Sequence, residues 1–314
     1  VFLLFALMAK PGKLQTFLEY SAAKSVLTGL GVLPAPAAIA LGKSVGRVFH
    51  LVAADLRRTA AINLRLAFPE KSEEERKELI RVCFDTLGRQ LGLFSQFATR
   101  SQEQLQNMIE PSGLENVIAA KEKYGNRFIF WTAHLGAWEL TSFGLSFLGH
   151  PFTFLVRRID NPRIEDMVDR VRTRFGDKTL DKLSAARSML KILRQGETPL
   201  GLLFDLNALD DEAIFVDFFG VPAATSFIIS KLAVRTNTPL VSVFSPWNEQ
   251  TKKFQLIVGP AVVPEVTGDE EADVRNLTIK LSLIIEDQIR QHPGQWLWVH
   301  KRWKTRPPGE PPIY

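Results

Sequence analysis

The sequence has a single cysteine, Cys83, among its 314 residues. One cysteine excludes a disulfide framework and any zinc site built from several cysteines, and it fits a reducing compartment such as the cytoplasm. Histidine is also scarce, and no two of the five histidines have the i, i+4 spacing of a helical metal site. We therefore expect neither thiol redox chemistry nor a metal site.

Long uninterrupted hydrophobic runs are missing as well. The opening segment VFLLFALMA places nine apolar residues before Lys10, too few to span a bilayer. No charged residue occurs between Lys24 and Lys43, but Pro34 and Pro36 interrupt any continuous helix there. The stretch predicts two short helices, which either lie in a membrane interface or form an ordinary helical hairpin on a soluble core.

Acidic residues are fewer than basic ones. The chain has 39 lysines and arginines against 34 aspartates and glutamates, so its net charge is +5 and its pI is about 9.3. This bias favours acidic partners such as phosphates, anionic lipids, nucleic acid or an acidic carrier protein. It narrows the class of partner without indicating an activity.

The amino-terminal part of the sequence predicts helices. Apolar residues recur at three- and four-residue spacing through residues 14–110, and the segment after Ser72 combines a serine cap with acidic residues. From about residue 125, short apolar runs alternate with amphipathic stretches, which is typical of an α/β fold. We expect a helical, membrane-associated region over residues 1–110 and an α/β core over residues 111–314, together forming one compact unit.

The core is expected to hold a mixed, largely parallel sheet flanked by helices. The apolar runs that predict strands are RFIFWTA, PFTFLVR, PLGLLFD, AIFVDFF, PLVSVFS and KFQLIVG. The helices predicted among them cover residues 162–175, 183–195, 222–236 and 269–291.

His134 follows the first of these strands and precedes a predicted helix. Functional sites in open α/β sheets gather at such junctions, at the carboxyl ends of strands. On one continuous helix, His134 and Glu139 would point about 140° apart, so they can meet only if His134 lies in the preceding turn. The pair is either a catalytic base with its helper acid, or a core histidine followed by an acid favoured at a helix start.

Arginines are concentrated in the segment LVRRIDNPRIEDMVDRVRTRFG, residues 155–176. Guanidinium groups suit the binding of phosphate or carboxylate. The same segment also contains enough acids for a solvated, charge-balanced helix face, which we expect to account for the arginines beyond Arg163.

Two aspartates stand out in the apolar segment that follows. Asp205 ends a predicted strand, and Asp217 interrupts an apolar run. A buried carboxylate requires a cationic or hydrogen-bonding partner, and a histidine would be suitable. Alternatively, Asp217 points outward from an edge strand, as the alternation of side chains along a strand permits.

The segment QWLWVHKRWKTRPP near the carboxyl end mixes tryptophan with lysine and arginine. This composition is typical of a membrane interface, and it also suits stacking on single-stranded nucleic acid. Because no nucleic-acid-binding motif is present, we expect the membrane and no nucleic acid as a partner.

Four motifs occur in an order that resembles the bacterial lipid A biosynthesis late acyltransferases. They are the H-x-x-x-x-E of His134 and Glu139, RRIDNP at 157–162, VDFFGVPAATS at 216–226 and WLWVHKRWKTRPPGEP at 296–311. RRTAAINLRLAFPEKSEEER at 57–76 also looks like the amino-terminal helical region of that family. The family belongs to a lysophospholipid acyltransferase-like superfamily, together with the phosphatidylinositol mannoside acyltransferases.

The resemblance implies an enzyme that moves an acyl chain from acyl carrier protein or coenzyme A to a hydroxyl of a membrane glycolipid. His134 would be the general base, and no covalent intermediate or cofactor is expected. Glu139 matches the acid of the motif, whereas the mannoside acyltransferases suggest the acid in the V-E-F-F-G segment, which is Asp217 here. The acid that partners His134 is therefore left open.

The resemblance also implies a substrate-binding set and a location. The substrate-binding residues are expected to be Arg157, Asn161, Arg163, Asp205 and Gly136. Within this set, Arg157 or a backbone N–H near Gly136 is expected to stabilise the oxyanion. The expected location is the cytoplasmic face of the bacterial inner membrane. The alternatives are an acyltransferase for phosphatidylinositol mannoside or another lipid acceptor, and a lipid-binding protein that shares the fold without catalysis.

Overall fold

The computed structural model describes residues 12–182, 185–209 and 212–314. The segment VFLLFALMA lies outside these residues. The helices are α1 (Lys13–Val32), α2 (Ala35–Val52), α3 (Ala54–Ala67), α4 (Glu73–Phe97), α5 (Gln102–Gln106), α6 (Leu114–Tyr124), α7 (Trp138–Phe147), α8 (Pro162–Arg172), α9 (Ala185–Gln195), α10 (Ile228–Thr236) and α11 (Glu270–Gln291). The strands are β1 (Ile109–Ser112), β2 (Ile129–Thr132), β3 (Thr153–Val156), β4 (Lys178–Asp181), β5 (Leu200–Leu203), β6 (Ala213–Phe218), β7 (Val221–Ser226), β8 (Leu240–Phe244), β9 (Trp247–Asn248) and β10 (Lys253–Val262).

The main sheet is mixed and largely parallel, as predicted. Its strand order is β1-β10-β8-β2-β5-β3-β4, and the short β9 pairs with β10. The pairings of β10 with β8 and β9 are antiparallel, whereas the pairings along β8-β2-β5-β3-β4 are parallel. The carboxyl ends of these central parallel strands therefore lie along one edge of the sheet.

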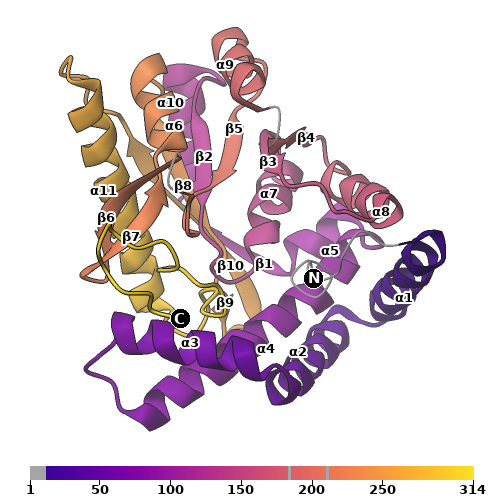
Figure 1. Cartoon of the computed structure of the whole chain (residues 1–314). Coiled ribbons are helices and arrows are strands. Elements are labelled where there is room, and N and C mark those ends of the chain that lie inside the picture. The colour runs from indigo at the N-terminus through magenta and orange to yellow at the C-terminus, as the bar shows by residue number, and fades with distance from the viewer. Residues whose placement is uncertain (1–11, 183–184, 210–211) are drawn as a thin grey trace.

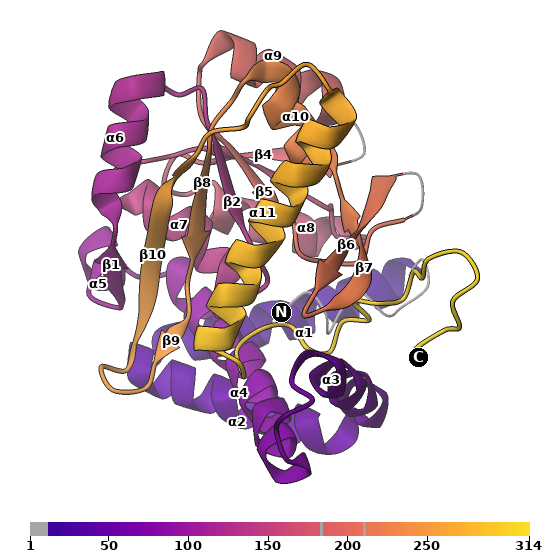
Figure 2. The ribbon, with the colours of Figure 1, turned by 90° about the vertical axis from the view of Figure 1, so that its left-hand side faces the viewer.

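Helices cover both faces of this sheet. One hydrophobic core lies between the sheet and α9, α10 and α11, and the other lies between the sheet and α6, α7 and α8. Helices α2 to α4 gather at one end of the molecule, below the sheet in both views, and α1 lies beside α8 (Figures 1 and 2). Helix α4 supplies buried residues to both cores, so it closes this end of the sandwich.

The prediction of a helix over residues 222–236 is wrong in its first part. Residues 221–226 form β7, which pairs with β6 as a separate two-stranded sheet beside α11 (Figure 2). The turn between the strands holds Phe219 and Gly220 with φ angles of 55° and 75°. Two successive residues with positive φ are typical of a tight hairpin turn, and this turn overrides the helix propensity of the alanines that follow. The helix begins only at Ile228.

The amino-terminal helices form where their end signals occur. Helix α1 ends at Val32, just before Pro34, and α2 follows with proline in its first turn. Helix α4 begins with the predicted serine cap, where the Ser72 hydroxyl accepts from the N–H of Glu75, whose carboxylate accepts from the N–H of Ser72. Among the described residues no single helix has the length and hydropathy to cross a membrane, although α2 and α3 meet those criteria together, bent by 91°.

Glycines let α2 and α4 approach closely. Gly42 and Gly46 of α2 face Gly88 and Gly92 of α4, and a methyl group on Gly88 would lie 2.9 Å from the carbonyl carbon of Gly42. This is the small-residue packing of two close helices.

Residues 42–46 match the sequence pattern G-x-S-x-G, which in α/β-hydrolases marks a catalytic serine. Here Ser44 lies inside α2, where its hydroxyl donates to the Ala40 carbonyl. This serine therefore lacks the strand-to-helix turn of a nucleophile elbow.

Candidate active site

The register of two neighbouring strands brings His134 and Asp205 together. Strands β2 and β5 are parallel, and Thr132 pairs with Leu203 at their carboxyl ends. His134 and Asp205 each follow two residues later, so both leave the sheet at the same place. The Nδ1 atom of His134 lies 2.8 Å from Oδ1 of Asp205.

Asp205 accepts hydrogen bonds from three groups. Besides Nδ1 of His134, the His134 backbone N–H and the Trp296 indole N–H both donate to Oδ2, at 2.8 and 2.7 Å. Burial on its own would raise the pKa of Asp205, but the charge of His134 and these hydrogen bonds outweigh it and hold the pKa below the ordinary value. Asp205 is therefore an ionised acceptor in contact with the His134 ring, and it is not among the residues that line the cavity beside His134.

This geometry defines the state of the His134 ring. A carboxylate can only accept, so Nδ1 carries a proton and Nε2 has its lone pair free in the neutral ring. The ring lies beside Trp138, with 5.0 Å between ring centroids, and it lines a cavity. Nε2 is therefore the atom that can accept a proton from a molecule in the cavity.

Glu139 lies in the first turn of α7, as predicted, but its carboxylate pairs with an arginine. Arg172 at the end of α8 donates to both of its oxygens, at 3.1 and 3.4 Å. Both residues line the same cavity as His134. The expected carboxylate contact with His134 is made by Asp205 instead. The assignment of Arg172 to a solvated helix face is also wrong, because its side chain is 7% exposed.

Asp217 lies away from this pair. It is on β6 with its side chain exposed, between the buried Val216 and Phe218. It is not among the residues that line the cavity. The alternation of an edge hairpin explains its place in an apolar run, so the outward-pointing alternative for Asp217 holds.

The turn at Gly136 does not offer free N–H groups. Gly136 has a φ of 61° and donates to the Gln295 carbonyl at 2.9 Å. The neighbouring N–H groups of Leu135 and Ala137 donate to the carbonyls of Ala133 and Ser245. The N–H groups of residues 135–137 are therefore engaged within the turn, and Gly136 serves its shape.

The RRIDNP segment divides between the cavity and a helix start. Arg157 lines the cavity and is exposed. Asn161 caps α8 by accepting from the N–H groups of Arg163 and Ile164, while its amide donates to Thr16 and Glu19 of α1. Arg163 lies over the rings of Phe17 and Tyr20. Asn161 and Arg163 thus attach α1 to α8. We expected both to bind substrate, but neither lines the cavity.

The tryptophans near the carboxyl end are core residues rather than membrane anchors. Trp296, Trp298 and Trp303 are fully buried. They pack with Phe218 and Phe219 of the β6–β7 hairpin. Composition suggested an interface, but this segment packs under the hairpin. Its backbone also supports the site, because the Leu297 N–H donates to the His134 carbonyl at 3.0 Å.

The cavity beside His134 has a volume of about 350 Å³. Helices α2, α4 and α7 and strands β2, β3 and β5 supply most of its walls. Its polar lining includes His134, Glu139, Arg157, Arg172 and His300, and most of its other residues are apolar. Apolar pockets of roughly 300–1,000 Å³ with a few convergent polar groups are typical ligand sites.

Comparison with known proteins assigns the chain to a family. The family model described as bacterial lipid A biosynthesis acyltransferase matches residues 11–305. The chain belongs to this acyltransferase family. It is 28% identical over 254 residues to a lipid A biosynthesis acyltransferase of Haemophilus influenzae, covering 81% of this chain and 77% of the relative.

Two Escherichia coli relatives carry more specific names. The chain is 26% identical over 290 residues to the lipid A biosynthesis myristoyltransferase, covering 91% of this chain and 87% of the relative. It is 28% identical over 300 residues to the lauroyltransferase, covering 91% and 93%. The protein is thus an acyltransferase of the lipid A biosynthesis type, as the sequence motifs predicted.

His300 is a cavity residue of this acyltransferase that the sequence did not single out. Its Nε2 accepts from the Asn207 N–H at 3.3 Å, and its carbonyl accepts from the Asn63 amide of α3 at 2.7 Å. Burial, aided by the proximity of His134, lowers the pKa of His300 to about 4. His300 is therefore neutral at neutral pH. It does not form an ion pair with the Asp205 carboxylate, which remains the partner of His134.

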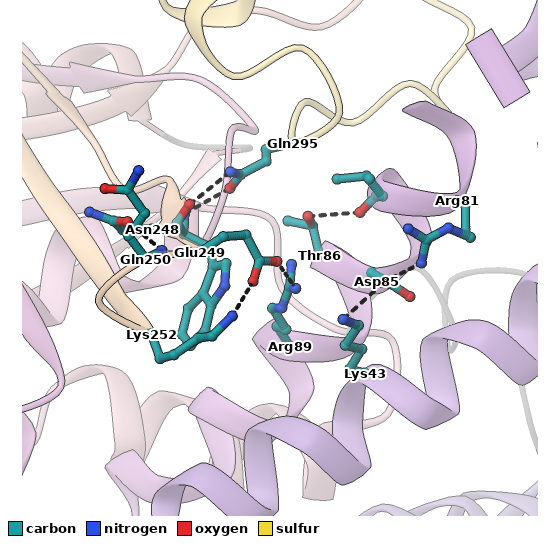
Figure 3. Close-up of polar contacts among 12 residues, drawn as sticks. Lys43, Arg81, Asp85, Thr86, Arg89, Asn248, Glu249, Gln250, Lys252 and Gln295 are labelled. Atoms are coloured by element: carbon teal, nitrogen blue, oxygen red, sulfur yellow. Dashed lines mark hydrogen bonds and ion pairs between the residues drawn. The ribbon is translucent and has the colours of Figure 1, made fainter. Parts of the chain in front are cut away.

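Polar residues of α4 connect α2 with the segment that follows β9 (Figure 3). Asp85 pairs with Lys43 of α2 and with Arg81, at 3.4 and 3.1 Å. One turn later, Arg89 pairs with Glu249 beyond β9, and Gln90 donates to the Gly136 carbonyl. Helix α4 thereby connects the amino-terminal helices, the β9 turn and the active-site turn of the acyltransferase.

Proposed function

We propose that this acyltransferase moves a fatty acyl chain from an acyl carrier protein or coenzyme A thioester to a hydroxyl of a lipid A precursor. His134 acts as the general base, and no covalent acyl-enzyme forms. The observation that carries this proposal is the contact of the buried Asp205 with Nδ1 of His134, whose side chain lines a largely apolar cavity.

The reaction is one transfer in two steps. Nε2 of His134 takes the acceptor's hydroxyl proton as the hydroxyl oxygen bonds the thioester carbonyl carbon, giving a tetrahedral oxyanion and an imidazolium. The carbonyl then re-forms, the carbon–sulfur bond breaks, and the imidazolium protonates the departing thiolate. The products are an ester and a free thiol, and His134 returns to its neutral form. Asp205 stabilises the imidazolium between the two steps.

Arg157 is the group that stabilises the oxyanion in this proposal. The N–H groups of residues 135–137 are occupied, whereas Arg157 lines the cavity as an exposed cation. The Glu139–Arg172 pair holds the start of α7 against the end of α8, and because the two charges balance, Arg157 is the cation that we assign to the oxyanion.

The acceptor reaches the site from the cytoplasmic face of the inner membrane. Leu41, Val45, Val48 and Val52 form an exposed apolar row on α2, and their side chains are 39–72% exposed. Val45 of this row also lines the cavity. A lipid held at this row would therefore lie at the cavity wall, and the net charge of +5 favours anionic lipid and an acidic carrier protein.

Membrane binding through the α2 row is tested by the double substitution Val48→Glu/Val52→Glu. Two charges on this row are expected to weaken binding to phosphatidylglycerol-containing vesicles at least about tenfold, because burying each valine stabilises docking by roughly 1.5–3 kcal/mol. Vesicle co-sedimentation measures this. Ile118→Glu is the control, since Ile118 is 49% exposed on the distant α6. Equal losses in both variants would contradict docking through α2.

The substrates are identified by a transfer assay. Purified protein is given radiolabelled acyl groups on acyl carrier protein or on coenzyme A, with lipid A precursors, phosphatidylinositol mannosides or lysophospholipids as acceptors. We expect labelled product with a lipid A precursor. Product only with a mannoside or a lysophospholipid would assign a different acceptor, and no product from any pair would favour a lipid-binding protein without catalysis.

A further inference from the structure

The cavity beside His134 ends in a group of phenylalanines. Phe130 of β2, Phe154 of β3 and Phe152 just before β3 line it, and each is at most 8% exposed. The Phe152 ring lies 5.0 Å from that of Phe130 and 5.8 Å from that of Phe154, measured between centroids. The lining near the active site is more open, since Leu203 is 41% exposed and Arg157 is also exposed. The aromatic group lies towards the amino-terminal ends of β2 and β3, away from the carboxyl ends that lead to His134 and Asp205, so it forms the buried end of the cavity.

Gly201 of β5 makes room for one of these rings. It is buried, it lines the cavity, and it lies between Phe130 of β2 and Phe154 of β3 in the sheet register. A methyl group on Gly201 would lie 2.6 Å from Cδ2 of Phe152 and 3.0 Å from Cβ of Phe154. The Phe152 ring thus fills the space that a side chain at position 201 would take.

The buried end lies at a fixed depth below the reacting groups. Phe130 and Gly201 each precede their active-site residue, His134 and Asp205, by four positions, which is about 13 Å along a strand. The three phenylalanine rings have no hydrogen-bonding groups, so this end of the cavity suits a hydrocarbon tail. A rigid sheet supplies both the reacting pair and the floor, which keeps the distance between them constant.

We propose that Phe152 and Gly201 set the length of the acyl chain that the enzyme transfers. This inference rests on the proposed function. A chain whose end meets the Phe152 ring buries all its methylenes, a shorter chain leaves space empty, and a longer chain must displace a packed ring. A mismatch of one methylene in an apolar pocket changes selectivity roughly 10-fold or more.

The test compares kcat/KM for even-numbered saturated donors from decanoyl to stearoyl. Phe152→Leu is expected to move the optimum to a longer donor, because the smaller side chain deepens the cavity. Gly201→Ala is expected to move it to a shorter donor, because the new methyl group pushes the Phe152 ring into the cavity. The double variant Gly201→Ala/Phe152→Leu removes the overlapping ring and is expected to reverse the shift of Gly201→Ala.

Phe128→Leu is the matched control. Phe128 is fully buried in the same core and contacts Phe130, but it does not line the cavity. Its donor optimum is expected to equal that of the wild type. An unchanged optimum in Phe152→Leu, or a double variant that keeps the shorter optimum of Gly201→Ala, would overturn the proposal if thermal melting shows both variants to be folded.

A binding measurement separates this proposal from the proposed function. Free fatty acids of the same lengths displace a fluorescent fatty acid from the protein, without any transfer. A length preference that shifts in Phe152→Leu supports the role of the cavity floor even if no acceptor is acylated. Transfer by the wild type with no shift in either measurement would overturn the length proposal and leave the acyltransferase proposal intact.

Discussion

Replacing Asp205 with asparagine is expected to slow acyl transfer by roughly 100- to 10,000-fold, about as much as replacing His134 with alanine. The alanine variant lacks the base altogether. The asparagine variant keeps His134 itself unchanged and replaces its partner with a side chain of the same size. Its loss therefore measures how far the function of His134 depends on the carboxylate.

The hydrogen bonds around Asp205 explain the size of this effect. Oδ2 accepts from two N–H groups, the backbone of His134 and the indole of Trp296. An asparagine therefore keeps its oxygen at that position and turns its NH₂ towards Nδ1 of His134. Nδ1 must then accept, so the proton moves to Nε2, and Nε2 can no longer accept the proton of the substrate hydroxyl.

Asp217→Asn is the matched control, since it makes the same chemical change at the exposed acid on β6. It is expected to retain activity close to the wild type. Activities are compared at neutral pH, where Asp205 is ionised because its pKa is lowered. The stability from this lowered pKa is present above the ordinary aspartate value of about 3.9 and is lost as the pH falls further. A large loss in Asp217→Asn with an active Asp205→Asn would contradict the pairing seen in the structure.

The position of His134 could be predicted from the sequence, but its partner could not. The strand RFIFWTA and the following helix identify a turn at the sheet edge, and Asp205 likewise marks a strand end. Their contact depends on β5 lying next to β2, although about 70 residues separate the two strands in the chain. The five-residue spacing of His134 and Glu139 favoured a local contact, which the Glu139–Arg172 pair replaces.

Burial of polar and aromatic groups was the other property that composition did not predict. The tryptophans beside Lys301 and Arg302 match a membrane interface in type, yet they are buried, and Arg302 is 1% exposed. The Arg302 guanidinium donates to the Ala224 carbonyl and the Thr225 hydroxyl of β7. That contact requires the β6–β7 hairpin. The sequence predicted a helix, rather than a strand, for the residues that form β7.

Gly136→Ala is expected to lower activity at least about 100-fold, because the turn that holds His134 must move. A methyl group on Gly136 would overlap the Ser245 carbonyl and lie 2.6 Å from Cα of Pro246. Both are backbone atoms beside β8, so neither can rotate away as a side chain could. A displacement of about 1 Å at a catalytic group is enough for a loss of this size.

Gly220→Ala separates this overlap from the backbone conformation. Gly220 has a φ of 75°, comparable to the 61° of Gly136, but a methyl group there meets no atom within 4 Å. This variant is expected to lose about 1–2 kcal/mol of stability, which is the usual cost of placing a residue with a side chain in the left-handed backbone conformation. Its activity is expected to equal that of the wild type. Thermal melting and the transfer assay on both variants provide the comparison. If Gly136→Ala were as active as Gly220→Ala, the turn at residues 134–137 would tolerate movement, and fixed placement of Nε2 could not be the basis of catalysis.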